Sequence, residues 1–183
     1  MKKALSQNGL GKRFGASILA LGMALTFAWQ PAAAATVTVA LQLPGDPAAV
    51  TMIAAEQALL ALTNDDRAAN GLAPLESDPD TLDIARQRAA SQINAPSLSH
   101  FNAAGDLAFV DLMSSANVTY VLAGENLARA YDDDPAVTQR IENALMNSPL
   151  HRKNILEKTF NRVAIGVATD GTGQITFAEV YRN

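Results

Sequence analysis

Two strand-forming segments close the chain, and they limit its fold more than any other part of the sequence. The segments "RVAIGVAT" (162–169) and "QITFAEVYR" (174–182) flank "DGTG", which has the glycines of a tight turn. β-Branched and aromatic residues on both sides of such a turn predict an antiparallel hairpin. Helical patterns occupy the chain before it, and this order predicts an α+β fold in which helices cover a small antiparallel sheet.

Helical periodicity begins near Val50, where an apolar stripe starts that runs toward Asn70-Gly71, a signal for a helix C-terminus. Further helices are predicted over 80–93 and 106–115. The segment "YDDDPAV" predicts a fourth, with Asp134 as its N-cap, Pro135 at the first helical position and an end near residue 146.

A short fifth helix is predicted from "NSPLHRKNIL" (147–156), with Ser148 as N-cap and Pro149 at the first helical position. This placement puts His151 in the first turn. The positive helix end and the neighbouring cations Arg152 and Lys153 disfavour a protonated imidazole there. We therefore expect a neutral His151, which is the form that a metal ligand or a general base requires.

The first 35 residues have the pattern of a secretory signal peptide. A basic start is followed by the apolar run "ASILALGMALTFAW" and the small residues "PAAAA". Residues 36–49 are interpreted as an N-terminal extension with a short edge strand, and residues 50–183 as one domain. The apolar run is short for a membrane span and no later one is longer, so we expect a secreted or periplasmic protein that is not an integral membrane protein.

Charge and cysteine content exclude several functions. Four of the 14 Lys and Arg residues lie within 1–35, whereas all 18 acidic residues follow, so residues 36–183 carry a formal charge of −8. Such a chain is a poor partner for nucleic acid or an anionic membrane surface. Cysteine is absent, which excludes disulfides, cysteine nucleophiles and cysteine-ligated zinc.

Three residues are candidates for a functional site: His100 in the segment "SLSHF", Glu125 in "AGENLA", and His151. Each also has a structural interpretation, as a loop residue, a strand-end carboxylate and a helix residue. Their spacing matches no local zinc motif such as H-E-x-x-H. The residues alone therefore leave a His-Glu-His cluster open.

The order of the motifs resembles one known family. "LLALTNDDRAANGLAPL", "SLSH", "AGENLA", "LMNSPLHRKNIL" and "VAIGVATDGTGQITFAEV" follow one another as in the CAP superfamily of cysteine-rich secretory, antigen 5 and pathogenesis-related 1 proteins, most like its cysteine-free bacterial SCP-domain branch. The resemblance implies an α-β-α sandwich with a cleft lined by His100, Glu125 and His151. It also implies that the two histidines, with Glu125, can bind zinc or another divalent cation.

The chain departs from the family pattern at four positions. Leu145 replaces the usual Trp, Leu150 replaces the usual Gly before the second histidine, and Glu179 replaces a Gln. Glu179 is expected either to add an acid near the cleft or to face solvent. No acid stands near Ser148, where the second cleft glutamate of eukaryotic members falls, and Glu142 is the candidate substitute.

Three functions remain open from the sequence. The first is a ligand- or surface-binding module for a lipid-like or cell-envelope ligand, without enzymatic activity. The second is a metal-assisted hydrolase or protease that uses His100, His151 and Glu125. In the third, the same residues form a polar network that is purely structural.

Overall fold

A computed structural model describes residues 47–131, 134 and 136–183. The predicted signal peptide and residues 36–46, including the predicted edge strand, lie outside the described residues and stay predictions. Helix α1 (Pro47–Ala69) begins three residues before Val50, so the end of the predicted extension is helical.

The described strands form one four-stranded sheet in the order β1-β3-β4-β2. Its strands are β1 (Glu76–Ser77), β2 (Ala123–Tyr131), β3 (Arg162–Thr169) and β4 (Gln174–Arg182). The predicted hairpin is confirmed as β3 and β4, whose antiparallel register pairs Val163 with Tyr181. Strand β2 pairs with the other side of β4, and the short β1 pairs in parallel with β3.

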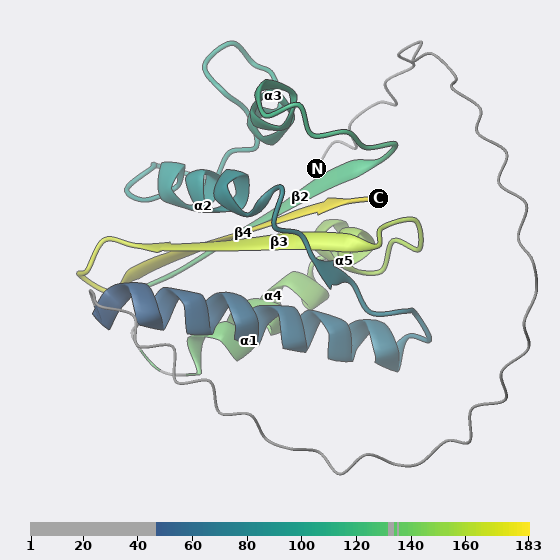
Figure 1. Cartoon of the computed structure of the whole chain (residues 1–183). Helices are drawn as coiled ribbons and strands as arrows, with labels where there is room; N and C mark the ends of the chain where they lie inside the picture. Colours follow the sequence, from purple (N-terminus) through teal and green to yellow (C-terminus); the bar gives the residue numbers. More distant parts are fainter. Residues whose placement is uncertain (1–46, 132–133, 135) are drawn as a thin grey trace, which may run out of the picture. The chain divides into compact units, whose positions relative to one another are not determined.

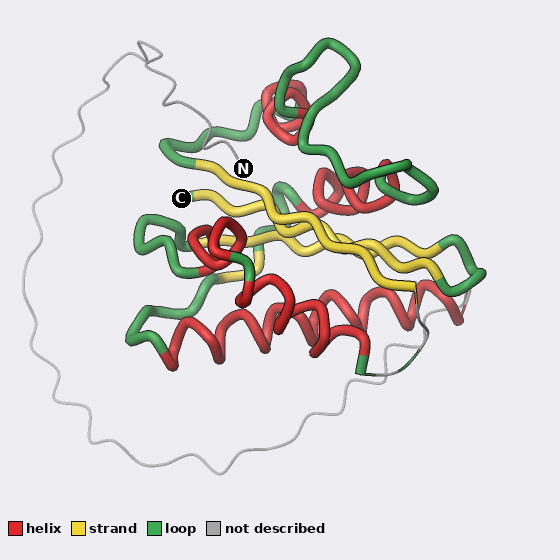
Figure 2. Tube along the Cα trace, turned by 180° about the vertical axis from the view of Figure 1, so that it is seen from behind, coloured by secondary structure: helices red, strands yellow, loops and turns green. Residues whose placement is uncertain are grey.

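Helices cover both faces of this sheet. Helices α1, α4 (Val137–Asn147) and α5 (Pro149–Ile155) lie on one face, and α2 (Leu82–Ser91) and α3 (Ala108–Ser115) on the other (Figure 1). Figure 2 shows the three longer strands running between the two helical layers. The fold is therefore the expected α-β-α sandwich, with an antiparallel hairpin at its centre.

Each face of the sheet has its own apolar core, because successive side chains of a strand point to opposite faces. Val163, Ile165 and Val167 belong to the larger core, together with residues of α1, α4 and α5. Ala164 belongs to the second core, under α2 and α3. Gly166 has no side chain, and a Cβ there would lie 2.2 Å from the backbone of Ala85, so α2 rests directly on β3.

Helix boundaries differ from the predicted ones by a few residues. Helix α2 begins at Leu82 and ends at Ser91, inside the predicted 80–93, and α3 begins two residues after Asp106. Helix α4 begins at Val137; Asp134 still accepts a hydrogen bond from the backbone N–H of Ala136, at 2.8 Å. Pro135 lies outside the described residues.

Strand β2 is absent from the sequence prediction. Its residues "AGENLARAY" include Gly, Glu, Asn and three Ala, which have low strand propensity. Pairing with β4 along the whole of β2 supplies the hydrogen bonds that the local sequence does not favour. This strand carries Glu125, so the strand that the sequence did not predict is the one that positions this site residue.

Candidate functional site

Glu125 lies on β2 and its side chain is buried on the face of the sheet that α2 covers. The residue is 2% exposed, and a buried carboxylate needs charged or polar partners. Arg88 of α2 supplies one: its Nε atom lies 2.7 Å from Glu125 Oε1 and its Nη2 atom 3.3 Å from Oε2. The pair joins α2 to the edge of the sheet.

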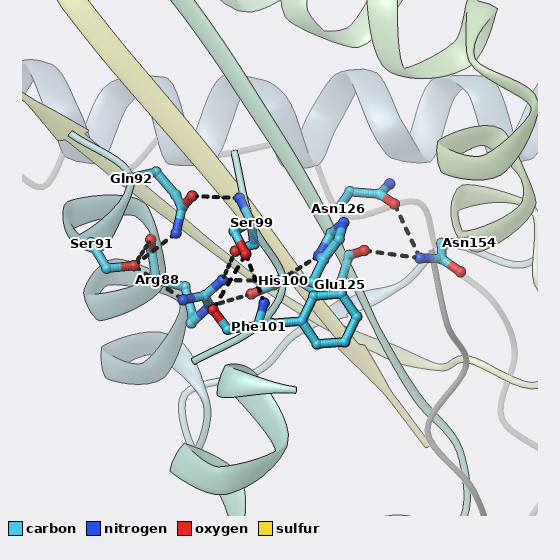
Figure 3. A network of polar contacts seen from close by, with 9 residues as sticks. All are labelled: Arg88, Ser91, Gln92, Ser99, His100, Phe101, Glu125, Asn126 and Asn154. Carbon is cyan, nitrogen blue, oxygen red and sulfur yellow. Dashed lines mark hydrogen bonds and ion pairs between the residues drawn. The ribbon is translucent and has the colours of Figure 1, made fainter. Parts of the chain in front are cut away.

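The second partner of Glu125 is His100, on the loop between α2 and α3. Nδ1 of His100 lies 2.7 Å from Glu125 Oε2 (Figure 3). Two hydrogen bonds hold the backbone of this loop against α2. Ser99 N–H donates to the side-chain oxygen of Gln92, and Ser99 C=O accepts from Arg88 Nη2 at 2.6 Å. The position of His100 is therefore set by α2 and by β2 together.

The contact with Glu125 assigns different roles to the two ring nitrogens of His100. When Nδ1 donates to the carboxylate, Nε2 of a neutral ring is the acceptor. This is the arrangement in which a carboxylate orients an imidazole for metal binding or for proton transfer. His100 is partly exposed, so its ring is not closed off from solvent.

His151 lies in the first turn of α5, as predicted, and is partly exposed. Burial and the nearby His100 both lower its pKa from the ordinary value of 6.5. The cause differs from the one expected, which was the helix end and the adjacent cations. Arg152 and Lys153 are exposed.

The structure therefore brings the three predicted site residues together to different degrees. Glu125 and His100 are in direct contact, and His151 lies near enough for the charge of His100 to affect its pKa. Among the described residues, the ring of His151 has no hydrogen-bond partner.

Three further residues shape the site and were missed in the sequence. Asn154 Nδ2 donates to the backbone C=O of Glu125 at 3.2 Å and to Asn126 Oδ1 at 3.0 Å, which ties α5 to β2 (Figure 3). Asn126 Nδ2 in turn donates to the C=O of His151 at 3.3 Å. A signal existed for Arg88 alone: it lies on the apolar face of α2 beside Ala85 and Ala89, where a cation needs a buried anion.

The donor set for a metal ion is incomplete. In the part of the chain that the structure describes, no group of three or more His, Asp and Glu side chains could hold a metal ion. Glu125 makes contacts through both oxygens, with Arg88 and His100. The two imidazoles alone provide fewer protein ligands than the three or four of known zinc sites.

Glu142 and Glu179 form a separate buried cluster. The expectation that Glu179 faces solvent is wrong, because it is 0% exposed. Glu142 is equally buried, and both carboxyl groups contact the hydroxyl of Thr63. Within the described residues neither contacts the ring of His100 or His151, so Glu142 does not replace the missing acid of the cleft.

Comparison with known proteins agrees with the geometry. The model of the cysteine-rich secretory protein family (CAP) matches residues 60–181, which include His100, Glu125 and His151. The chain is 32% identical over 117 residues to the uncharacterized protein YkwD of Bacillus subtilis, covering 64% of this chain and 44% of that protein. It is 33% identical over 113 residues to the uncharacterized membrane protein YlbC of the same organism, covering 61% of this chain and 31% of that protein. The chain thus spans less than half of these relatives.

Solved structures show the same fold. An extracellular SCP-domain protein from Bacillus anthracis superposes with a TM-score of 0.60 at 25% identity, over 76% of this chain and 44% of that one. An outer surface protein from Borrelia burgdorferi gives a TM-score of 0.60 at 16% identity, over 71% of this chain and 92% of that one. The described helices include none long and apolar enough to cross a membrane. On the family match and this fold, the chain belongs to the CAP family of cysteine-rich secretory proteins, in its bacterial SCP-domain form.

Proposed function

We propose that this protein is an exported binding module whose ligand site lies between the His100 loop and α5. One observation carries the proposal. Three of the five exposed large hydrophobic side chains in the described part of the chain stand within two residues of a histidine in the sequence: Leu98 (37%), Phe101 (42%) and Leu150 (55%). Exposed apolar side chains that gather around polar groups mark binding sites more often than isolated ones.

The chemistry of these residues favours an amphipathic ligand. The apolar side chains supply contact area, while the rings of His100 and of a neutral His151 supply hydrogen-bonding groups. A lipid-like molecule or a cell-envelope component with an apolar part has both features. Leu150 adds one apolar side chain to this site.

A fluorescent long-chain fatty acid is a suitable first probe. We expect saturable binding to the wild type, weakened at least tenfold in the Phe101→Ser/Leu150→Ser variant. Val121→Ser is the matched control, because Val121 is 67% exposed and away from both histidines in the sequence. Equal binding by all three proteins, or none by the wild type, contradicts the proposal for this class of ligand.

Hydrolysis is a second candidate function, favoured by the contact between Glu125 and His100. A carboxylate on Nδ1 orients the ring so that Nε2 can accept a proton from water or hold a metal ion. Zinc or another divalent cation would have His100 and His151 as its protein ligands. The described residues do not complete the set of donors for such an ion.

One variant separates the two functions. His100→Ala/His151→Ala removes both imidazoles and leaves Leu98, Phe101 and Leu150 in place. A binding module still binds the fatty acid through its apolar side chains in this variant, less tightly because the imidazole hydrogen bonds are lost, whereas a hydrolase loses turnover. The activity assay uses a panel of peptides and esters, with added zinc in one arm and a chelator in the other. No cleavage by the wild type in either arm argues against hydrolysis.

We also propose that the protein is exported, with cleavage near residue 35. The charge and apolar pattern of 1–35 support this, and two matched structures are described as an extracellular and an outer surface protein. Mass spectrometry of the protein from cell fractions tests it. A full-length chain that stays in the cytoplasm contradicts export.

A further inference from the structure

Two buried carboxyl groups meet on the face of the sheet that α1 and α4 cover. Glu142 Oε2 of α4 lies 3.1 Å from Thr63 Oγ1 of α1, and Glu179 Oε1 of β4 lies 3.2 Å from the same oxygen. Both glutamates are 0% exposed, and so is Thr63. Bulk solvent is therefore not in contact with either group to compensate a charge.

The Thr63 hydroxyl has too few hydrogens to donate a hydrogen bond to both carboxyl groups if both are ionised. A threonine hydroxyl has one hydrogen and can donate it to one acceptor at a time. Thr63 Oγ1 is within hydrogen-bond distance of two carboxyl oxygens, so one contact needs a hydrogen from the carboxyl side. A carboxyl group can provide one only when it is protonated.

The remaining contacts indicate which glutamate carries the proton. Glu179 Oε2 accepts from Tyr181 Oη at 2.6 Å and from Asn126 Nδ2 at 2.8 Å, and donors of this kind stabilise an ionised carboxylate. Glu142 Oε1 is buried, and the described residues offer it no conventional donor. The nearby carboxyl group of Asp66 adds a further acid on this side and also disfavours an ionised Glu142.

The electrostatics favour a proton bound by the pair. Burial, the charge of Glu179 and the nearby Asp66 raise the pKa of Glu142 to about 9, and burial also raises the pKa of Glu179, where hydrogen bonds from Tyr181 and Asn126 act in the opposite direction. The nearby cation, Arg67 of α1, acts on Tyr181 but is occupied by backbone carbonyls, including those of Ile155 and Glu157. Among the described residues, no hydrogen bond joins Arg67 to Glu142 or Glu179.

The pair is joined to the helix that carries His151. Asn126 Nδ2 donates both to Glu179 Oε2 and to the backbone C=O of His151, at 2.8 Å and 3.3 Å. Glu142 lies on α4, which leads into α5 through Ser148 alone. A second negative charge at Glu142 would repel Glu179 in a site closed to bulk solvent. Because β4 is hydrogen-bonded to a strand on each side, we expect the repulsion to displace α4.

We propose that Glu142 and Glu179 form a buried proton-binding pair, which holds one proton at neutral pH, and that loss of this proton in alkaline solution loosens α5 beneath His151. The bound proton completes the chain from Glu142 through Thr63 to Glu179. The inference concerns the folded protein itself and does not depend on which ligand the site binds.

The first experiment observes the proton directly. In protein with ¹³C-labelled glutamate, the Cδ resonance of Glu142 should have the chemical shift of a protonated acid at pH 7 and should titrate only above pH 7. The Glu142→Gln variant assigns and removes this resonance. Glu56→Gln is the control, because Glu56 is buried but paired with Arg86 at 2.7 Å. Ionised shifts for both Glu142 and Glu179 at pH 7 in the wild type overturn the proposal, whether or not the variants fold.

The second experiment tests the link to α5. Hydrogen exchange of the α5 amides, normalised for the pH dependence of intrinsic exchange, should be faster in the wild type at pH 9.5 than at pH 7. In Glu142→Gln the two protection values should be equal, because the neutral amide cannot ionise. If the wild type loses the proton but keeps the same α5 protection, the link to α5 is wrong.

Discussion

His100 Nδ1 lies 2.7 Å from Oε2 of the buried Glu125, and this contact joins a surface loop to the edge strand β2. The same carboxylate is paired with Arg88 of α2, which is 4% exposed. Glu125 thus connects β2 to α2 and to the loop that follows α2. Its carboxylate therefore contacts His100, which belongs to the candidate site, and pairs with Arg88, which is buried in the core.

Removing this carboxylate should cost stability as well as site geometry. Glu125→Ala leaves the Arg88 guanidinium buried without an anion, and breaking a buried pair in this way costs about 3–5 kcal/mol. Chemical denaturation at pH 7 measures the change in the free energy of unfolding. Glu76→Gln, at an exposed position of β1, is the control and should leave that free energy unchanged. A loss below about 1 kcal/mol in Glu125→Ala would show that Arg88 finds another partner.

His151 should titrate below the ordinary histidine pKa of 6.5, because burial and His100 oppose its protonation. Since the folded state then binds fewer protons than the unfolded state, stability should fall as the pH drops through 6.5. Nuclear magnetic resonance of the ring protons measures the pKa. In His151→Gln this part of the acid destabilisation should disappear from the stability profile between pH 7 and 5. A ring pKa at or above 6.5 would contradict the combined effect of partial burial and of His100 on this ring.

Gly166→Ala should destabilise the fold by about 2 kcal/mol or more, because α2 and β3 would have to move apart. The added Cβ would lie 2.2 Å from backbone atoms of Ala85 and Arg86, which cannot rotate away. Gly124→Ala is the comparison: its Cβ would lie 3.2 Å from side-chain atoms of Asn154 and Phe160, which can adjust. Thermal unfolding of both variants should show the larger loss in Gly166→Ala, and equal losses would contradict the close contact.

Arg67→Met should cost about 2 kcal/mol or more, because the buried guanidinium is the donor to several backbone carbonyls. It donates to the C=O of Ala73, Ile155 and Glu157, at 2.9, 2.6 and 3.0 Å, and so holds the segment after α5. Arg67→Lys should restore little, since one ammonium cannot reproduce the planar set of donors. Arg152→Met, at an exposed position, is the control. Full stability of Arg67→Lys would contradict the role of the planar geometry.

The candidate site was predictable in part. His100 and His151 were identified by their motifs, and the first-turn position of His151 followed from Ser148-Pro149. The contact between Glu125 and His100 was not predictable, because it depends on β2, whose residues have low strand propensity. Arg88 and Asn154 were missed for the same reason: their partners are defined by the packing of α2 and α5 against that strand.

What the sequence determined by itself is local. The β3–β4 hairpin followed from alternating β-branched residues around a glycine turn, and the helices followed from their periodicity and end signals, because these patterns act over a few residues. The tertiary structure decided which charges are buried. Glu142 and Glu179 are 37 positions apart in the chain and share one hydroxyl only because α1 and α4 pack on the same face of β4. The free energy of a charge depends on the solvent and partners around it, and only the packed fold defines those surroundings.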